Sequence, residues 1–184
     1  KLGYRYCDVI VGTMPGLDKH VEAVSGLGRK VVNIPQGIST KSLNPKREVL
    51  EQYFIDKYIP ENKFLITYTG SLGAANGMEF IVETARKLVN EKHIHFLIVG
   101  EGYLKDDLIN SAHGLDNVTF APKIRKDQVR HCLELSDLLV ASVRNEKIYE
   151  FGISLNKFID YMAAKKPILC MYSGFPSMLN EANC

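Results

Sequence analysis

The stretch "KFLITYTGSLGAANGMEFIVETARKLVNEKHIHFLIVG", residues 63–100, decides the fold. It begins with the apolar run KFLITYTG and ends with the apolar run IHFLIVG, and each run has the length of a buried strand. Between them, the apolar residues of GMEFIVETARKLVNEK recur at helical spacing. A strand, a covering helix and a second strand in this order predict a parallel pair of strands.

The same alternation continues on both sides of this stretch. The further strands that we predict are residues 7–14, 30–37, 117–122, 137–143 and 167–172. The further helices that we predict are residues 15–28, 46–60, 103–114 and 125–136, and one that follows Ser154. Residues 38–48 are polar and rich in turn-forming residues, so we interpret them as a linker. The pattern predicts an α/β fold, a Rossmann-like parallel sheet with helices on both faces.

Composition excludes several classes of protein. The chain of 184 residues is 46% hydrophobic, and its net charge of +2 gives no broad basic surface for nucleic acid. No apolar run approaches the roughly 20 residues of a membrane span, and no signal peptide is recognisable. The four cysteines are scattered, so we expect reduced thiols in a cytoplasmic protein. The first residues enter almost directly into a strand and the last ones carry no capping signal, so we expect a piece of a longer chain.

Ligands of parallel α/β sheets bind beyond the carboxyl ends of the strands. This rule selects four loops, at residues 70–77, 100–102, 122–125 and 144–154. In the first loop, Gly70, Gly73 and Gly77 let the backbone approach a ligand and present N–H groups to an anion. The alternative is a glycine-rich turn that only connects a strand to a helix.

The second loop, with Gly100 and Gly102, carries a Gly-x-Gly pattern after a strand. A dinucleotide site would need a third glycine, where this chain has Lys105, and an acidic residue after the next strand, which ends in FAPK. NAD is therefore not expected. The loop either lines a ligand or is a tight turn.

The segment "EFGISLNKFIDYMAAKKPI", residues 150–168, predicts a helix with one apolar face, a Ser154 N-cap and polar residues near its start. Lys157 there opposes the helix dipole, which is favourable only if an anion such as phosphate binds beside it. Asp160 could accept the paired hydroxyls of a ribose. The alternative is a solvated pair between Lys157 and Asp160.

The histidines predict no metal site. His93 and His95 flank one residue of a strand, but no third ligand lies nearby in the sequence, so a strand-edge pair is favoured. His20, His113 and His131 are expected at surface positions of helices or at helix ends.

In order along the chain, CDVIVGTM, VVNIPQGIS, YTGSLGAANGMEFIVETARKL, FLIVGEGYLKDDL, NVTFAPKIRKDQVRHCLELSDLLVASV and SLNKFIDYMAAKKPIL resemble segments of the family 4 retaining glycosyltransferases. These enzymes have the GT-B fold, and the series is similar to their nucleotide-sugar-binding half. The last segment is most similar to a bacterial subgroup that builds surface polysaccharides.

The resemblance implies site residues. Asp160 falls on the second Glu of the family's Glu-x7-Glu motif, the ligand of the ribose diol. Gly152 falls on the first Glu, and Glu150 lies two residues early. The family's diphosphate-binding Arg and Lys fall on Ser71 and Asn76, so the charge must be met elsewhere.

We expect Lys157 and the start of its helix to meet that charge, with Lys123 or Arg144 as helpers, and residues 122–124 to contact the uracil through backbone groups. We expect Lys157 and Glu150 to be the catalytic residues. The nucleotide-binding residues that we expect are Gly70, Ser71, Gly73, Gly100, Lys123, Ile124, Ser154, Leu155, Asn156 and Asp160.

The resemblance thus implies a donor-binding domain at 41–184, truncated at its C-terminus, after the end of an N-terminal domain and a linker at 1–40. The enzyme would transfer sugar from a UDP-sugar to a polysaccharide or lipid-linked acceptor, held mainly by the missing N-terminal domain. It would need neither metal nor cofactor, and it would be a bacterial cytoplasmic protein, free or peripheral at the membrane. The fragment alone would be inactive. The alternatives are half of a GT-B UDP-N-acetylglucosamine 2-epimerase, or a non-catalytic nucleotide-binding module.

Overall fold

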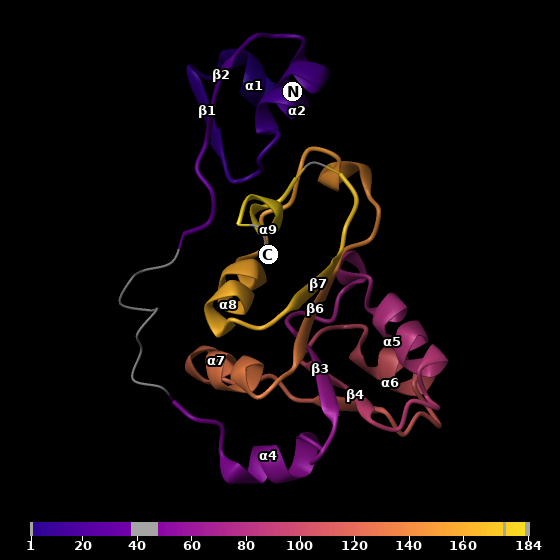
Figure 1. Cartoon of the computed structure of the whole chain (residues 1–184). Coiled ribbons are helices and arrows are strands. Elements are labelled where there is room, and N and C mark those ends of the chain that lie inside the picture. Colours follow the sequence, from indigo (N-terminus) through magenta and orange to yellow (C-terminus); the bar gives the residue numbers. More distant parts are fainter. Residues whose placement is uncertain (1, 38–47, 175, 183–184) are drawn as a thin grey trace. The chain divides into compact units, whose positions relative to one another are not determined.

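The computed structural model describes residues 2–37, 48–174 and 176–182, which form two compact units (Figure 1). Unit 1 comprises Lys1–Ile38, Asn145–Ile159 and Ser173–Cys184, and unit 2 comprises Ser39–Arg144 and Asp160–Tyr172. Apart from Glu48, the predicted linker lies outside the described residues.

Unit 1 begins with a small βαβ arrangement. Helix α1 (Leu2–Tyr6) is followed by β1 (Val9–Gly12), α2 (Leu17–Ser25) and β2 (Lys30–Asn33), and the two strands are parallel. Ile10 of β1 packs with Leu17 and Val21 of α2 in a small buried core. The prediction that the chain enters a strand directly is wrong, because α1 comes first.

Unit 1 also contains the 3-10 helix η2 (Lys147–Tyr149) and helix α9 (Met178–Glu181). The prediction that the last residues carry no capping signal is wrong. The Ser177 hydroxyl accepts a hydrogen bond from the N–H of Leu179 at 3.3 Å, and the N–H of Ser177 donates to Oδ1 of Asn180 at 2.9 Å. These reciprocal bonds satisfy backbone donors at the helix start.

Unit 2 is built on a five-stranded, fully parallel sheet in the order β5-β4-β3-β6-β7. Its strands are β3 (Phe64–Thr69), β4 (Ile94–Val99), β5 (Val118–Ala121), β6 (Leu138–Ser142) and β7 (Ile168–Met171). Its helical segments are α4 (Gln52–Tyr58), the 3-10 helix η1 (Ala74–Asn76), α5 (Met78–Lys87), α6 (Lys105–Ser111) and α7 (Lys126–Glu134), and α8 (Asn156–Ala164) joins it from Asp160 onward.

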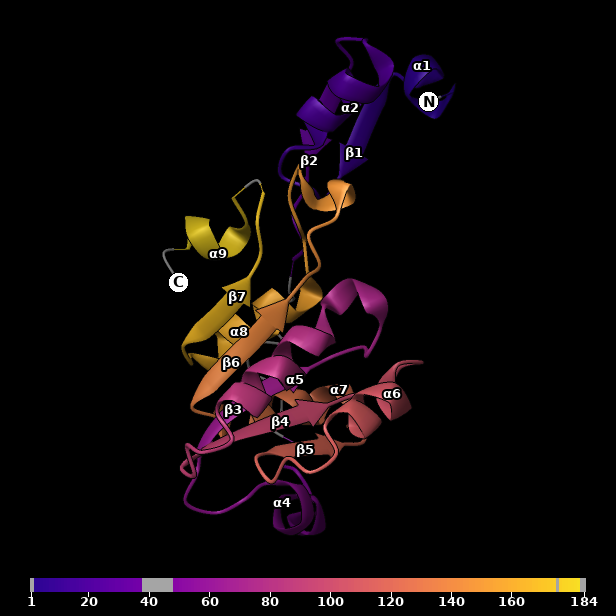
Figure 2. The ribbon, with the colours of Figure 1, turned by 90° about the vertical axis from the view of Figure 1, so that its right-hand side faces the viewer.

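Helices cover both faces of this sheet. Because side chains alternate along a strand, Tyr68 and Ile98 pack beneath α5 and α6, whereas Leu65 and Leu97 pack with α4 and α7 on the other face. Figure 2 shows α5 and α6 in front of the strands, and Figure 1 shows α7 on the opposite side. The predicted parallel sheet with helices on both faces is confirmed.

A buried tyrosine fastens α8 to the middle of the sheet. The Tyr161 hydroxyl accepts a hydrogen bond from the N–H of Thr69 at 3.0 Å and donates one to the carbonyl of Val140 at 3.2 Å. Its side chain is fully buried, and burial raises the pKa of its phenol to about 12. The hydroxyl therefore joins β3, β6 and α8.

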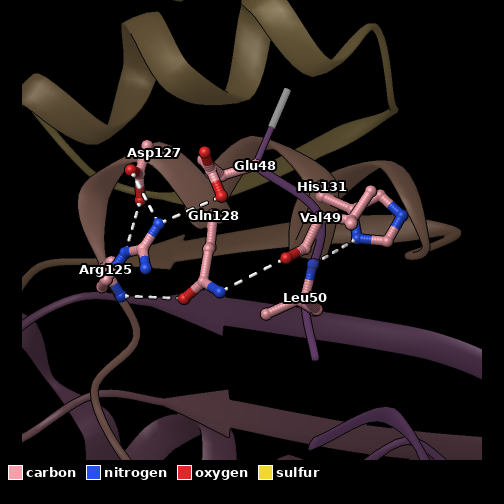
Figure 3. A network of polar contacts seen from close by, with 7 residues as sticks. All are labelled: Glu48, Val49, Leu50, Arg125, Asp127, Gln128 and His131. Atoms are coloured by element: carbon pink, nitrogen blue, oxygen red, sulfur yellow. Dashed lines mark hydrogen bonds and ion pairs between the residues drawn. The ribbon is translucent and has the colours of Figure 1, made fainter. Parts of the chain in front are cut away.

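The segment before α4 docks on α7 through side chains (Figure 3). The N–H of Leu50 donates to Nδ1 of His131 at 3.0 Å, and Nε2 of Gln128 donates to the carbonyl of Val49 at 3.3 Å. These bonds replace helical ones, so α4 starts at Gln52, later than the predicted residue 46. His131 lies in the last turn of α7, in agreement with the predicted position near a helix end, and its ring is half-buried.

Candidate functional site

The strand order places a topological switch between β3 and β6. From β3 the chain builds outward through β4 and β5, and then returns to the other side of β3 with β6 and β7. The loops that leave two neighbouring strands in different directions create a crevice at such a point, where α/β proteins bind their ligands. The glycine-rich loop, residues 70–77, follows β3 at this position.

Inward-facing hydrogen bonds hold the glycine-rich loop. The carbonyl of Ser71 accepts from the Tyr68 hydroxyl at 2.8 Å and from Nδ2 of Asn76 at 3.0 Å. The N–H of Leu72 donates to the carbonyl of Glu101 at 2.9 Å. Within the described residues, the N–H groups of Ser71 and Gly73 form no hydrogen bond, so they can bind an acceptor.

Gly100 has a packing role in the next loop. A Cβ atom at this position would lie 1.9 Å from the carbonyl oxygen of Gly70. At Gly102 it would lie 2.3 Å from the carbonyl oxygen of Leu72. The loops after β3 and β4 are therefore in backbone contact, which supports the tight-turn interpretation of this Gly-x-Gly pattern.

The cations proposed as helpers differ in their surroundings. Arg144 Nε donates to Oε1 of Glu79 at 2.8 Å, so a carboxylate already balances its charge. Lys123 is exposed, and its ammonium has no carboxylate partner among the residues described. The side chain of Ile124 packs into the core beneath α4 and α7, so only its backbone remains for a ligand, and the predicted contact with a nucleobase stays a prediction.

Asp160 pairs with a residue that the sequence reasoning did not select. Its carboxylate Oδ2 accepts a hydrogen bond from Nζ of Lys126, the first residue of α7. The Asp160 side chain is 23% exposed and that of Lys126 is 75% exposed. A lysine at the start of a helix opposes the dipole, so the argument applied to Lys157 could also have selected Lys126.

The start of α8 differs from the prediction. The helix begins at Asn156, and the Ser154 hydroxyl is buried without a hydrogen-bond partner in the described part of the chain. Ser154 therefore does not cap the helix, and that prediction is wrong. Leu155 and Lys157 are half-buried, and Asn156 is exposed.

Glu150 lies at the end of η2 and is exposed. Its carboxylate forms no ion pair with the residues described. Gly152 is buried with a φ of 117°, a backbone conformation that suits only glycine. The position where the family has its first Glu cannot carry a side chain in this backbone conformation without strain.

Six residues of the predicted site follow the carboxyl ends of β3, β4 and β5 and therefore lie at the same edge of the unit 2 sheet. They are Gly70, Ser71, Gly73, Gly100, Lys123 and Ile124. Glu150, Ser154, Leu155, Asn156 and Lys157 belong to unit 1.

The predicted strand-edge pair of His93 and His95 is wrong. His93 precedes β4 and is exposed, whereas buried His95 shares a hydrogen bond with the Thr119 hydroxyl at 2.8 Å. No group of three or more His, Cys, Asp or Glu that could hold a metal ion occurs among the described residues. The absence of a metal requirement stays a prediction. His20 lies in the first turn of α2 and is half-buried, with its ring against Tyr4 and Phe151.

Two remaining predictions concern the membrane and the cysteines. In the described parts of the chain, no helix has the length and apolar character to cross a bilayer. Cys7, Cys132 and Cys170 form no disulfide bond within the described residues, as predicted, and Cys184 lies outside them.

Comparison with known proteins identifies the family of the chain. The family model described as "Glycosyl transferases group 1" matches residues 63–184. The WcaI protein of Escherichia coli, whose name links it to glycosyl transfer in colanic acid biosynthesis, is 37% identical over 81 residues, which are 43% of this chain and 20% of that protein.

Two solved structures share the fold. A glycosyltransferase from Rickettsia africae superposes with a TM-score of 0.70 at 18% identity, covering 96% of this chain and 47% of that one. HepE from Anabaena, in complex with UDP, gives 0.66 at 15% identity, with coverage of 94% and 47%. The chain therefore spans less than half the length of these relatives, and its predicted fold as one half of a GT-B protein is confirmed.

Proposed function

The chain belongs to the group 1 glycosyl transferases, and on this premise we propose that it supplies the donor-binding part of a retaining glycosyltransferase. The donor is a UDP-sugar, in line with the UDP in the HepE structure. The acceptor is a polysaccharide or lipid-linked sugar, held mainly by an N-terminal domain whose end is residues 1–40. Residues 41–184 form the donor domain.

One observation carries this proposal. At the switch point of the unit 2 sheet, the glycine-rich loop presents the N–H groups of Ser71 and Gly73 without partners among the described residues. Backbone N–H groups at the carboxyl end of a parallel strand suit the phosphate oxygens of a nucleotide. This geometry supports a nucleotide ligand over a plain connecting turn.

The other residues have separate proposed roles. Asp160 accepts a hydrogen bond from the ribose, and the backbone of Lys123 and Ile124 contacts the uracil. Lys157, together with the Ser154 hydroxyl and the backbone of residues 154–156, binds the diphosphate. The Ser154 hydroxyl, which is buried and has no hydrogen-bond partner among the described residues, supports this role, since such a group gains a hydrogen bond when an acceptor arrives.

Catalysis in this proposal is mainly electrostatic. The diphosphate is the leaving group, and cations and N–H dipoles fixed around it stabilise the charge that develops as the anomeric bond breaks. Lys157 supplies the positive charge, and Glu150 contacts the donor sugar. No metal ion or cofactor is needed, and the enzyme works in the bacterial cytoplasm or at the inner face of the membrane. The 184 residues bind the donor but do not transfer its sugar.

Isothermal titration of the chain with UDP at low salt tests the proposal. We expect binding at millimolar nucleotide or below, and a loss of about ten-fold for Asp160→Ala, because a charge-assisted hydrogen bond is removed. The matched control is Asp116→Ala. It removes an exposed ion pair in which Nζ of Lys92, just before β4, lies 2.8 Å from Oδ2 of Asp116, just before β5. No binding by the unmodified chain, or equal losses in both variants, would contradict the proposal.

A further inference from the structure

The ion pair between Lys126 and Asp160 joins the first turn of α7 to α8 within unit 2. Nζ of Lys126 donates to Oδ2 of Asp160, and in the described residues the other carboxylate oxygen, Oδ1, accepts no hydrogen bond. The pair therefore keeps one free acceptor next to an ammonium that has further N–H donors.

The position of Lys126 needs an explanation other than helix stability. It is the first residue of α7, where a positive charge opposes the helix dipole. The neighbouring cation, Arg125, is balanced locally, because it pairs with Asp127 at 3.0 Å and with Glu48 at 3.2 Å (Figure 3). Lys126 pairs instead with a residue of another helix, and its own side chain is 75% exposed, so solvent screening limits what the pair adds to stability.

The chemistry of the pair suits two adjacent hydroxyl groups. A carboxylate alone can only accept hydrogen bonds, so it recognises hydroxyls only as donors. Here Asp160 Oδ2 is already engaged by Lys126, which leaves Oδ1 for one hydroxyl. The oxygen of the neighbouring hydroxyl can accept from the Lys126 ammonium. Acceptor and donor together match a vicinal diol.

From this arrangement we propose that Lys126 is the second half of the ribose-binding site and selects nucleotides with both ribose hydroxyls. The inference rests on the proposed function, because it takes Asp160 as a ribose ligand. It adds a residue that donates a hydrogen bond to one hydroxyl while Asp160 accepts from the other.

The test compares UDP, 2′-deoxy-UDP and 3′-deoxy-UDP by isothermal titration to the unmodified chain, Lys126→Met and Lys126→Arg. Met keeps the length of the aliphatic stem without the charge, and Arg keeps a donor. We expect Lys126→Met to bind UDP about ten-fold more weakly, and its penalty for one of the two deoxy analogues to fall to about two-fold or less. Lys126→Arg should retain most of the UDP affinity of the unmodified chain and most of its penalty for that deoxy analogue.

The outcomes separate the two proposals. If the unmodified chain binds no UDP, the proposed function and this inference both fail. If it binds UDP but Lys126→Met weakens all three nucleotides equally, Lys126 acts only through its charge and the inference is wrong while the proposed function stands. Equal affinities of Lys126→Met and the unmodified chain for UDP would also overturn the inference about Lys126. Thermal unfolding without ligand should give similar midpoints for all three proteins, which shows that the variants are folded.

Discussion

Gly152 packs directly against the ring of Pro15. A Cβ atom at position 152 would lie 2.7 Å from Cδ and 3.2 Å from Cγ of that proline. The backbone of Gly152 also has a φ of 117°. Two independent constraints therefore disfavour any side chain at position 152, where the family resemblance places its first Glu.

We predict that Gly152→Ala lowers the free energy of unfolding by about 2 kcal/mol or more, since backbone strain and overpacking each contribute about 1–3 kcal/mol. Urea unfolding measures the effect. Gly28→Ala is the matched control in the same unit, because a Cβ atom there would meet no atom within 4 Å. Equal stabilities of the two variants would show that the contact with Pro15 is not tight in solution.

A second prediction concerns the contact between the loops after β3 and β4. Gly100→Ala places its Cβ atom 1.9 Å from the carbonyl oxygen of Gly70, and a backbone atom cannot move aside cheaply. We expect a loss of about 1–3 kcal/mol in unfolding free energy, together with weaker UDP binding. Gly73→Ala is the control, because its Cβ atom would meet only ordinary contacts, 3.5 Å from the Tyr103 ring. It should stay within about 1 kcal/mol of the unmodified chain.

A third prediction tests the buried tyrosine that joins α8 to the sheet. Tyr161→Phe removes the partner of the Thr69 N–H and leaves that donor buried without a hydrogen bond. We expect the unfolding free energy to fall by about 1–3 kcal/mol. Chemical denaturation measures it, and Tyr6→Phe, at a side chain 78% exposed, should change nothing measurable.

The sequence predicted the alternation of strands and helices because each buried strand of unit 2 is a near-continuous apolar run. It predicted element ends less well. The start of α4, for example, depends on hydrogen bonds from Leu50 to His131, 81 positions away. Local patterns contain no information on such contacts, so the helix was predicted too long.

The candidate site also had a part that could be predicted from local sequence and a part that could not. Loops at the carboxyl ends of strands could be predicted, because strand order in parallel sheets follows general rules. Lys126 could not be paired with Asp160 from the sequence, since 34 positions separate them. Gly152 was recognised as a departure from the family motif, but the proline that explains it was not.

A fourth prediction concerns pH. Burial, helped by the charge of Lys63, lowers the pKa of His95 below its ordinary value of 6.5. The imidazole of the folded protein therefore takes up its proton at a lower pH than that of the unfolded chain, which is protonated below about pH 6.5. The contribution of His95 to stability is therefore present above pH 6.5 and is lost as the pH falls toward its folded pKa.

Urea unfolding at pH 7, 6 and 5 measures this loss. Between pH 7 and 5, the unmodified chain should lose more stability than His95→Gln, by up to about 1.4 kcal/mol per pH unit. Glutamine can still form a hydrogen bond with Thr119 but cannot be protonated. His93→Gln, at an exposed position, should keep the slope of the unmodified chain. A slope that His95→Gln leaves unchanged would mean that another group causes it.

The last prediction separates stability from binding at the start of α8. The Ser154 hydroxyl is buried and has no hydrogen-bond partner among the described residues, which costs stability in the absence of a ligand. Ser154→Ala removes the unsatisfied group, so the free protein should be as stable as the unmodified chain or more stable, by up to about 1 kcal/mol. If the hydroxyl binds the diphosphate, the same variant should bind UDP about five- to ten-fold more weakly.

Ser177→Ala is the opposite control: it removes the cap of α9, so it should lower stability by about 1 kcal/mol and leave UDP affinity unchanged. A Ser154→Ala variant that is less stable but binds UDP normally would assign this hydroxyl to the fold and remove it from the nucleotide site.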